Sequence, residues 1–384
     1  MILTDTGFSK RDYDRYLIEK LNKFYDVTVI DLSSYLNKKV FNINLKKQKI
    51  FEFNNFVKVE NFDDFKKLLN KIEYSYAIDY ISSKNKKTLK FMQFLKSTKI
   101  QLVYIQLGLV SQTIRTKKEK ILRLLRLLTN PFAFIKKVFA ILNTRIRKKI
   151  FQSIIYDFMF ISGVEGEKDP IAKLAKKRIY THSSDYENTL NNLSNNFNFK
   201  NYIVFIDQNL PFHPAQFYRG EKPQVTEKKY FPALARAFKY LEQTFEKDII
   251  IATHPRANVT NYQNYFKGRK FLNSDTIDLV KYCDCVLAHT TTAISYAVIY
   301  QKPIIFLTSD EIIKSYDDYR VHSNARILGS EMLNIDHINL NSAKLKNYEL
   351  QVNTKKYDLF MNNFIKHPNS ENTNLTDQII KNLN

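Results

Sequence analysis

The sequence predicts an α/β protein with two domains, each built on a mainly parallel β-sheet covered by helices. Three observations support this fold class. Short apolar runs that favour strands alternate with helical patterns along the chain, which is typical of parallel sheets. The 384 residues suffice for two cores of ordinary size. A polar, Asn-rich stretch at residues 186–200 marks a linker between the two halves.

We expect the first domain at residues 1–195 and the second at residues 196–345. In the first, we expect strands at 1–4, 27–32, 76–80, 101–106 and 157–161, and helices at 12–24, 62–69 and 87–95. In the second, we expect strands at 202–206, 249–252 and 303–307, a further strand ending near residue 289, and a helix at 230–245. Residues 346–384 predict terminal helices at 357–365 and 376–383.

The composition is that of a packed globular protein. The chain is 44% hydrophobic and contains only 7 Gly and 9 Pro. Its two cysteines, Cys283 and Cys285, are too close in sequence for an easy disulfide. No signal peptide is recognisable at Met1, so a reducing cytoplasm is the expected location.

A formal net charge of +22 is the strongest compositional anomaly. It indicates an acidic substrate, nucleic acid or an anionic membrane as partner. Half of this charge lies in a basic insert at about residues 115–150, whose cations alternate with Leu, Ile and Phe at helical spacing. Such a pattern is typical of a helix that lies on a membrane surface, where each cation adds about 1 kcal/mol. The alternative is that the insert packs on the first domain and only exposes its charges.

Two polar groups of residues follow strands of the second domain. The first is His254-Pro255-Arg256, and the second is the hydroxyl cluster Thr290, Thr291 and Thr292 before a helix. Since ligands of open α/β sheets bind beyond the carboxyl ends of the strands, we expect both groups to face one crevice. Hydroxyl and N–H groups at a helix start bind anions, and an imidazole can reach the same phosphate. The alternatives are a simple helix cap and a simple strand-ending turn.

These motifs carry a resemblance to a known family. The His-Pro element, the segment DTIDLVKYCDCVLAHTTT and the following AISYAVIYQKPIIFL resemble the donor half of GT-B glycosyltransferases that use CMP-activated acidic sugars. Bacterial sialyltransferases and capsule Kdo transferases carry such motifs in this order, and CDP-glycerol glycerophosphotransferases look similar over the same span. The opening ILTDTGFSKRDYDRYLIEKL also looks like the start of capsule and surface-carbohydrate transferases.

The resemblance implies a GT-B fold, in which two Rossmann-like domains face a central cleft and the last helices cross back to the first domain. It implies a donor site in the second domain. His254 and the three threonines would bind the donor phosphate, Pro255 would fix the turn that presents His254, and Arg256 is an alternative phosphate contact. Asp207 and Gln208 would contact the base or ribose.

Glycosyl transfer also needs a base that takes the acceptor proton, and we expect this base in the first domain. Asp12 is the leading candidate because it follows the first strand, and Arg11 and Arg15 would orient it or bind the carboxylate of an acidic sugar. The alternative role of Asp12 is helix capping. Weaker candidates for the base are Asp5, His182 and Asp185.

We expect no metal and no cofactor besides the nucleotide-sugar donor. Asp12-Tyr13-Asp14 spells a DxD pattern, but acids two residues apart in a helix do not converge on one ion. The chain also lacks HExxH, paired CxxC motifs and a Walker A loop.

The sequence therefore predicts an inverting, metal-independent transferase that moves an acidic sugar of the Kdo or nonulosonic type from a CMP donor to a capsule or lipopolysaccharide acceptor. It would act in the cytoplasm, peripherally on the inner face of the membrane, bound through residues 115–150. One alternative is a transferase that uses CDP-glycerol or a UDP-sugar. Another is a non-catalytic basic protein that binds membrane or nucleic acid, although no nucleic-acid recognition module is recognisable.

Overall fold

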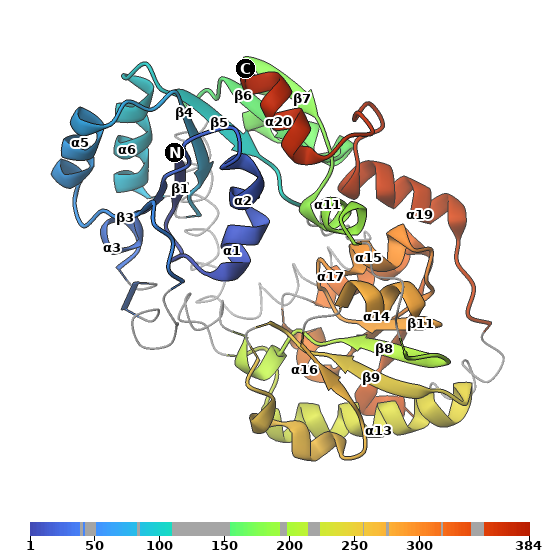
Figure 1. Cartoon of the computed structure of the whole chain (residues 1–384). Helices are drawn as coiled ribbons and strands as arrows, with labels where there is room; N and C mark the ends of the chain where they lie inside the picture. The colour runs from blue at the N-terminus through green and yellow to red at the C-terminus, as the bar shows by residue number, and fades with distance from the viewer. Residues whose placement is uncertain are drawn as a thin grey trace, which may run out of the picture. The chain divides into compact units, whose positions relative to one another are not determined.

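A computed structural model describes residues 1–38, 41–42, 51–82, 85–109, 154–192, 198–213, 223–255, 257–273, 276–315, 318–338 and 349–384. These residues form two compact units (Figure 1). Unit 1 contains residues 1–107, 154–184 and 366–384, and unit 2 contains residues 108–109 and 185–365. The basic insert at 115–150 lies outside the described residues.

The unit boundaries differ from those expected from the sequence. The expected linker begins with a helix, α11 (Ser184–Leu190), which belongs to unit 2 from Asp185 onward. The Asn188 side chain lies 3.4 Å from the Tyr296 hydroxyl, and the Asn192 amide donates to Asp278 over 2.9 Å. At the other end, unit 2 extends to Ile365, and only the last 19 residues belong to unit 1. The polar composition of residues 186–200 hid α11, in which Tyr186 packs against the core of unit 2 and Glu187 is buried.

Unit 1 is built on a seven-stranded parallel sheet with the order β3-β2-β1-β4-β5-β6-β7. Helices cover both of its faces (Figure 1): α5 and α6 pack on one face, and α2 and α20 pack on the other. The strands are β1 (Ile2–Thr4), β2 (Val29–Asp31), β3 (Phe56–Lys58), β4 (Tyr76–Tyr80), β5 (Gln101–Ile105), β6 (Phe158–Ile161) and β7 (Lys177–Tyr180). The helices are α1 (Lys10–Arg15), α2 (Ile18–Leu21), α3 (Ser33–Leu36), α5 (Phe62–Lys71), α6 (Lys86–Lys96), α9 (Val164–Glu167), α10 (Pro170–Leu174) and α20 (Leu375–Leu383).

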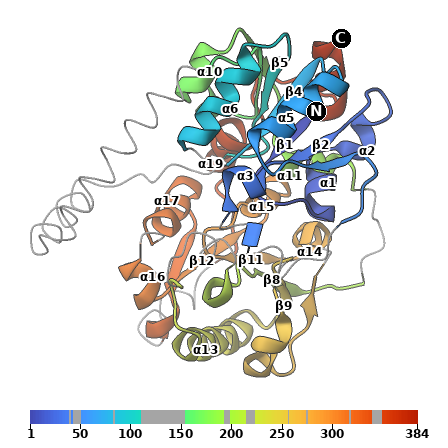
Figure 2. The ribbon, with the colours of Figure 1, turned by 90° about the vertical axis from the view of Figure 1, so that its left-hand side faces the viewer.

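Unit 2 is built on a six-stranded parallel sheet with the order β10-β9-β8-β11-β12-β13. The long helix α13 covers one face, and α14 and α15 cover the other (Figures 1 and 2). The strands are β8 (Tyr202–Ile206), β9 (Asp248–Ala252), β10 (Phe271–Leu272), β11 (Cys285–Ala288), β12 (Ile304–Thr308) and β13 (Glu331–Asn334). The α-helices are α13 (Glu227–Phe245), α14 (Thr276–Tyr282), α15 (Ile294–Ile299), α16 (Asp310–Lys314), α17 (Asp318–Leu328) and α19 (Thr354–Phe360).

Short 3-10 and π-helical turns complete unit 2. They are η1 (Leu210–Phe212), η2 (Val259–Asn261), η3 (Gln263–Phe266), η4 (Ile335–His337) and the π-turn η5 (Met361–Ile365). The central strands of this sheet are buried along their whole length, as is typical of a parallel sheet covered on both faces. Every strand pairs with its neighbours in parallel, so the carboxyl ends of all six strands meet at one edge.

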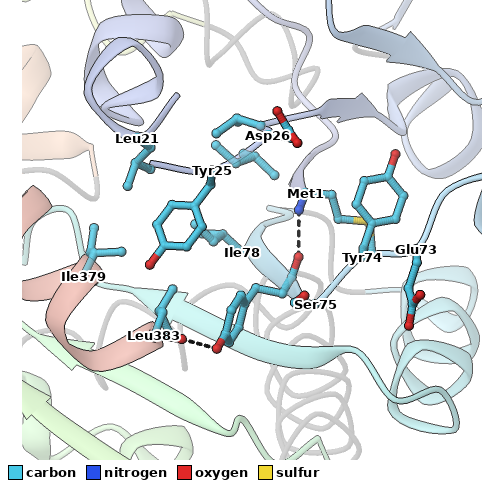
Figure 3. Close-up of a pocket in the computed structure, with 13 residues that line it drawn as sticks. Met1, Leu21, Tyr25, Asp26, Glu73, Tyr74, Ser75, Ile78, Ile379 and Leu383 are labelled. Carbon is cyan, nitrogen blue, oxygen red and sulfur yellow. Dashed lines mark hydrogen bonds between the residues drawn. The ribbon is translucent and has the colours of Figure 1, made fainter. Parts of the chain in front are cut away.

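A cavity of about 250 Å³ lies in unit 1 at the amino ends of β1 and β4 (Figure 3). Leu21 and Tyr25 line it from α2 and the turn after it, and Ile379 and Leu383 line it from α20. Ligands of parallel sheets bind at the carboxyl ends of the strands, so this cavity is at the wrong edge for a substrate. It marks instead where the terminal helix packs on the sheet. Among the described residues, no helix is long and apolar enough to cross a membrane.

Candidate functional site

The strand order of unit 2 defines a topological switch point between β8 and β11. From β8 the chain first adds β9 and β10 on one side of the sheet and then adds β11, β12 and β13 on the other. Loops that leave two neighbouring strands in opposite directions open a crevice, and this is where open α/β sheets bind ligands. The residues that follow β8, β9 and β11 therefore form the candidate site.

Gln208 and Thr290 meet across this switch point. The backbone N–H of Thr290 donates to the Gln208 side-chain oxygen over 2.7 Å, and the Gln208 amide nitrogen lies 3.3 Å from Thr290 Oγ1. Both side chains are half-buried. Two of the residues expected from the sequence are thus brought together, and their hydrogen bonds join the loop after β8 to the loop after β11.

The other two threonines lie in the turn before α15. Thr291 is half-buried, and its Oγ1 accepts a hydrogen bond from the Ala293 backbone N–H over 3.2 Å. Thr292 is exposed, and its backbone oxygen accepts from both the N–H and the hydroxyl of Ser295. These are local turn contacts of the capping kind, and they leave the Thr292 hydroxyl open to solvent.

Asp207 is buried, with 6% of its surface exposed. Its Oδ1 accepts from the Asn209 backbone N–H over 2.7 Å, and its Oδ2 accepts from the Tyr262 hydroxyl over 2.7 Å. Burial raises the pKa of the Asp207 carboxyl, while hydrogen bonds from Asn209, Tyr262 and the His254 backbone lower it. The carboxylate is occupied by donors of the protein itself. Its visible role is to tie together the turns after β8 and β9, and contact with a nucleotide stays a prediction.

His254 follows β9 and is half-buried, and the next residue, Pro255, is exposed. The ring of His254 lies beside that of His213, which follows β8 and η1. The two ring centroids are 5.4 Å apart, with the planes tilted by 59°. Arg256 lies outside the described residues. His213 was not singled out from the sequence because an isolated histidine carries little information, although it too stands before a proline shortly after a strand.

His289 lies at the end of β11 but belongs to the core rather than to the site. It is 1% exposed; its Nδ1 lies 2.7 Å from the Leu307 carbonyl, and its Nε2 lies 2.7 Å from the Tyr230 hydroxyl. Burial lowers the pKa of His289 to about 4. The ring is therefore neutral at pH 7, donating from Nδ1 and accepting at Nε2.

In unit 1, Asp12 occupies a helix cap. Its Oδ2 accepts from the Ser9 hydroxyl over 2.6 Å and from the Ser9 backbone N–H over 3.1 Å, and Ser9 caps α1 in return. These contacts form a capping box, the alternative role that the sequence left open. Arg11 and Arg15 are exposed. Their expected role in orienting Asp12 or binding the carboxylate of an acidic sugar stays a prediction.

The three weaker candidates for the base are scattered over the two units. Asp5 lies at the switch point of unit 1, between β1 and β4, and its Oδ1 accepts from the Ser82 N–H and hydroxyl over 2.8 and 2.9 Å. It is fully buried. His182 is also buried and forms an antiparallel bridge with Lys366. Asp185 belongs to unit 2, where it lies beside Tyr296.

Within the described ranges, no group of three or more His, Cys, Asp or Glu side chains is placed to hold a metal ion. The two acids of the DxD pattern contact different partners, since Asp12 bonds to Ser9 and Asp14 pairs with Lys10. The two cysteines are both free and buried.

Solved structures with a similar architecture identify the fold. No protein-family model and no curated protein sequence matches the chain. Among solved structures, a variant of the wall teichoic acid polymerase TagF is similar at a TM-score of 0.55 and 12% identity, covering 100% of this chain and 87% of that one. MurG from Acinetobacter baumannii is similar at a TM-score of 0.50 and 8% identity, covering 100% and 98%.

The two parallel α/β units therefore form a GT-B fold, which confirms the fold class predicted from the sequence. At these sequence identities the similarity establishes the architecture alone. What the site does has to be argued from its own residues.

Proposed function

We propose that this protein is a glycosyltransferase that takes its sugar from a nucleotide-activated donor bound by unit 2. One observation carries the proposal. At the switch point of the unit 2 sheet, Gln208 and Thr290 bond to each other directly, and His254 follows the adjacent strand. Polar and imidazole groups at such a place are suited to a nucleotide phosphate and its ribose.

Each residue has a distinct task in this proposal. His254 donates a hydrogen bond to the leaving phosphate and stabilises the charge that develops as the glycosidic bond breaks. The Thr292 hydroxyl, open to solvent, adds a second donor. Gln208 bonds to Thr290 through both ends of its amide, and the remaining N–H of that amide contacts the ribose or base. The acceptor proton goes to a base in unit 1, for which Asp12 remains the candidate.

For the donor we propose CMP linked to an acidic sugar of the Kdo or nonulosonic type. The support is the order of the His-Pro and threonine motifs, which matches that of CMP-sugar transferases. CDP-glycerol and UDP-sugars are the alternative donors, and the GT-B fold accommodates all three. A basic binding protein without catalytic activity is the alternative from another class, since a fold does not fix a function.

For the acceptor we propose an anionic surface polysaccharide or glycolipid at the inner face of the cytoplasmic membrane. The support is the net charge of +22, which attracts polyanions and anionic lipid surfaces alike. The insert at residues 115–150 supplies half of this charge. No metal and no further cofactor takes part in the proposed reaction.

A transfer assay tests the proposal. Wild-type protein is incubated with CMP-Kdo or a CMP-nonulosonate and a capsule or lipopolysaccharide acceptor, and CMP release and glycan extension are measured. His254→Ala should lower turnover at least 100-fold, because loss of one donor to a developing charge typically costs this much. Its melting temperature should stay within a few degrees of wild type. Turnover close to wild type in His254→Ala would refute the site.

A further inference from the structure

We propose that His213 is a second phosphate-binding residue and that His213 and His254 together hold one phosphate group of the donor. This inference rests on the proposed function, since it names a further residue of the same site. The sequence pattern assigned the phosphate to His254 and the threonines, with Arg256 as an alternative, and the structure brings a second imidazole beside that of His254.

The two imidazoles are close enough to share one anion. Their centroids are 5.4 Å apart, and the tilt of 59° between the rings means that they do not stack face to face. A centroid separation of this size leaves room for one phosphate to accept a hydrogen bond of about 2.8 Å from a nitrogen of each ring. Both rings are half-buried, which strengthens such bonds while leaving access for a ligand.

The backbone that carries both histidines is fixed by one buried carboxylate. Asp207 accepts hydrogen bonds from the backbone of Asn209, before His213, and from the backbone of His254. The third donor is the hydroxyl of Tyr262, a residue 2% exposed whose ring stacks on Phe231 at 5.0 Å. Asp207 thus joins the turn after β8 to the turn after β9, which lowers the cost of ordering these turns when an anion binds.

A second observation in the same turn points to a ligand. Asn209 is 3% exposed and adopts a left-handed backbone conformation with φ of 51°. Its side-chain Oδ1 is buried and has no hydrogen-bond partner among the residues that the structure describes. A buried acceptor without a partner is unfavourable, so a ligand that brings a donor is favoured there. A nucleotide offers such donors in its ribose hydroxyls and base amine.

Binding measurements with two matched ligands test the role of His213. Calorimetric titrations compare CMP with cytidine, which lacks the phosphate, in the wild type, His213→Ala, His254→Ala and the control His337→Ala. His337 is an exposed histidine of unit 2 that pairs with Asp310 over 3.0 Å. We expect His213→Ala to weaken CMP binding about tenfold or more and to leave cytidine binding unchanged. The control should bind both ligands like the wild type.

Three results would overturn the inference. If His213→Ala binds CMP like the wild type while His254→Ala does not, His213 is not a phosphate residue, and the proposed function stands. If His213→Ala weakens the binding of cytidine and of CMP equally, and His213→Gln does the same, His213 acts on the fold or contacts the base. If CMP binding disappears in EDTA and His213→Ala changes the dependence on added metal, the phosphate is held through a metal ion and not by the two imidazoles directly. A wild type that binds no nucleotide at all would overturn the proposed function itself.

Discussion

At the scale of single residues, the burial of His289 makes the free energy of unfolding depend on pH. Its pKa falls from 6.5 to about 4 because the ring is buried in unit 2. Between these two values the unfolded chain binds a proton that the folded chain does not. The stability that depends on a neutral His289 is therefore fully present above pH 6.5. It is lost as the pH falls toward 4, by about 3 kcal/mol in all.

The prediction from His289 is measured as the midpoint of urea unfolding at pH 7, 5.5 and 4.5. The wild-type midpoint should fall across this range, and His289→Gln, which cannot titrate, should lose part of that fall. His289→Gln should also be less stable than wild type at pH 7, since it loses the paired contacts to Tyr230 and Leu307. The same pH dependence in both proteins would contradict the assignment.

A substitution at Asp12 separates its role in the helix cap from its proposed role as the base. The capping box with Ser9 is worth about 1 kcal/mol, and an asparagine at position 12 retains most of it because its side-chain oxygen still accepts from the Ser9 N–H. Asp12→Asn should therefore remain folded and bind the donor nucleotide, yet lose turnover if its carboxylate takes the acceptor proton. Turnover and nucleotide binding are measured on the same preparation. Normal turnover would leave Asp12 with the capping role alone and move the search for the base elsewhere in unit 1.

The sequence predicted the residue types of the candidate site better than their roles. The His-Pro motif and the threonine cluster were recognisable because they follow apolar strands directly. The role of Asp207 was not, since only the structure shows that Tyr262, 55 residues away, occupies its carboxylate. The pairing of His213 with His254 was equally hidden, because it depends on the turn that η1 makes.

At the scale of elements, the buried central strands were predictable and the edges were not. β3 and β7 lie at the two edges of the unit 1 sheet and were not expected from the sequence. Most of their side chains are half-buried or exposed, so they lack a continuous apolar run. The expected helix at 12–24 is also divided into α1 and α2, because Leu17 adopts a left-handed conformation with φ of 57°.

At this scale we predict that the apolar face of the terminal helix α20 stabilises unit 1. Leu375, Ile379 and Leu383 are 0%, 1% and 5% exposed, and they bury one face of the helix against unit 1. Ile379→Ala should lower the free energy of unfolding by about 2–5 kcal/mol, since Ile379 already lines a cavity that its neighbours do not fill (Figure 3).

The matched control for Ile379 is Lys381→Ala on the exposed side of α20. Lys381 pairs with Glu371 over 2.6 Å, but both side chains are at least half exposed, so this ion pair contributes about 1 kcal/mol at most. Chemical unfolding of the two variants measures the difference. Equal effects would show that α20 is held by its surface charges and not by its apolar face.

At the scale of the whole molecule, two parallel sheets with switch points at their carboxyl edges explain why the chain alternates strands and helices throughout. The sequence predicted this fold class because the alternation of strand and helix patterns is recognisable even where the exact ends of an element are not. It could not predict the donor, because a cytidine, uridine or other base would be read by loops whose contacts follow no simple code. Nucleotide preference is therefore the property that connects the fold to a particular reaction.

The donor site proposed for unit 2 is tested most directly by a thermal-shift panel of CMP, CDP, UDP, GDP and ADP on the wild type and His254→Ala. A nucleotide at 100 times its Kd stabilises the native state by about 2.7 kcal/mol, which corresponds to a rise of roughly 5–10 °C in Tm for domains of this size. We predict that CMP raises the Tm of the wild type most and leaves that of His254→Ala unchanged. If no nucleotide shifts the wild type, or if His254→Ala responds equally, the donor site proposed for unit 2 is contradicted.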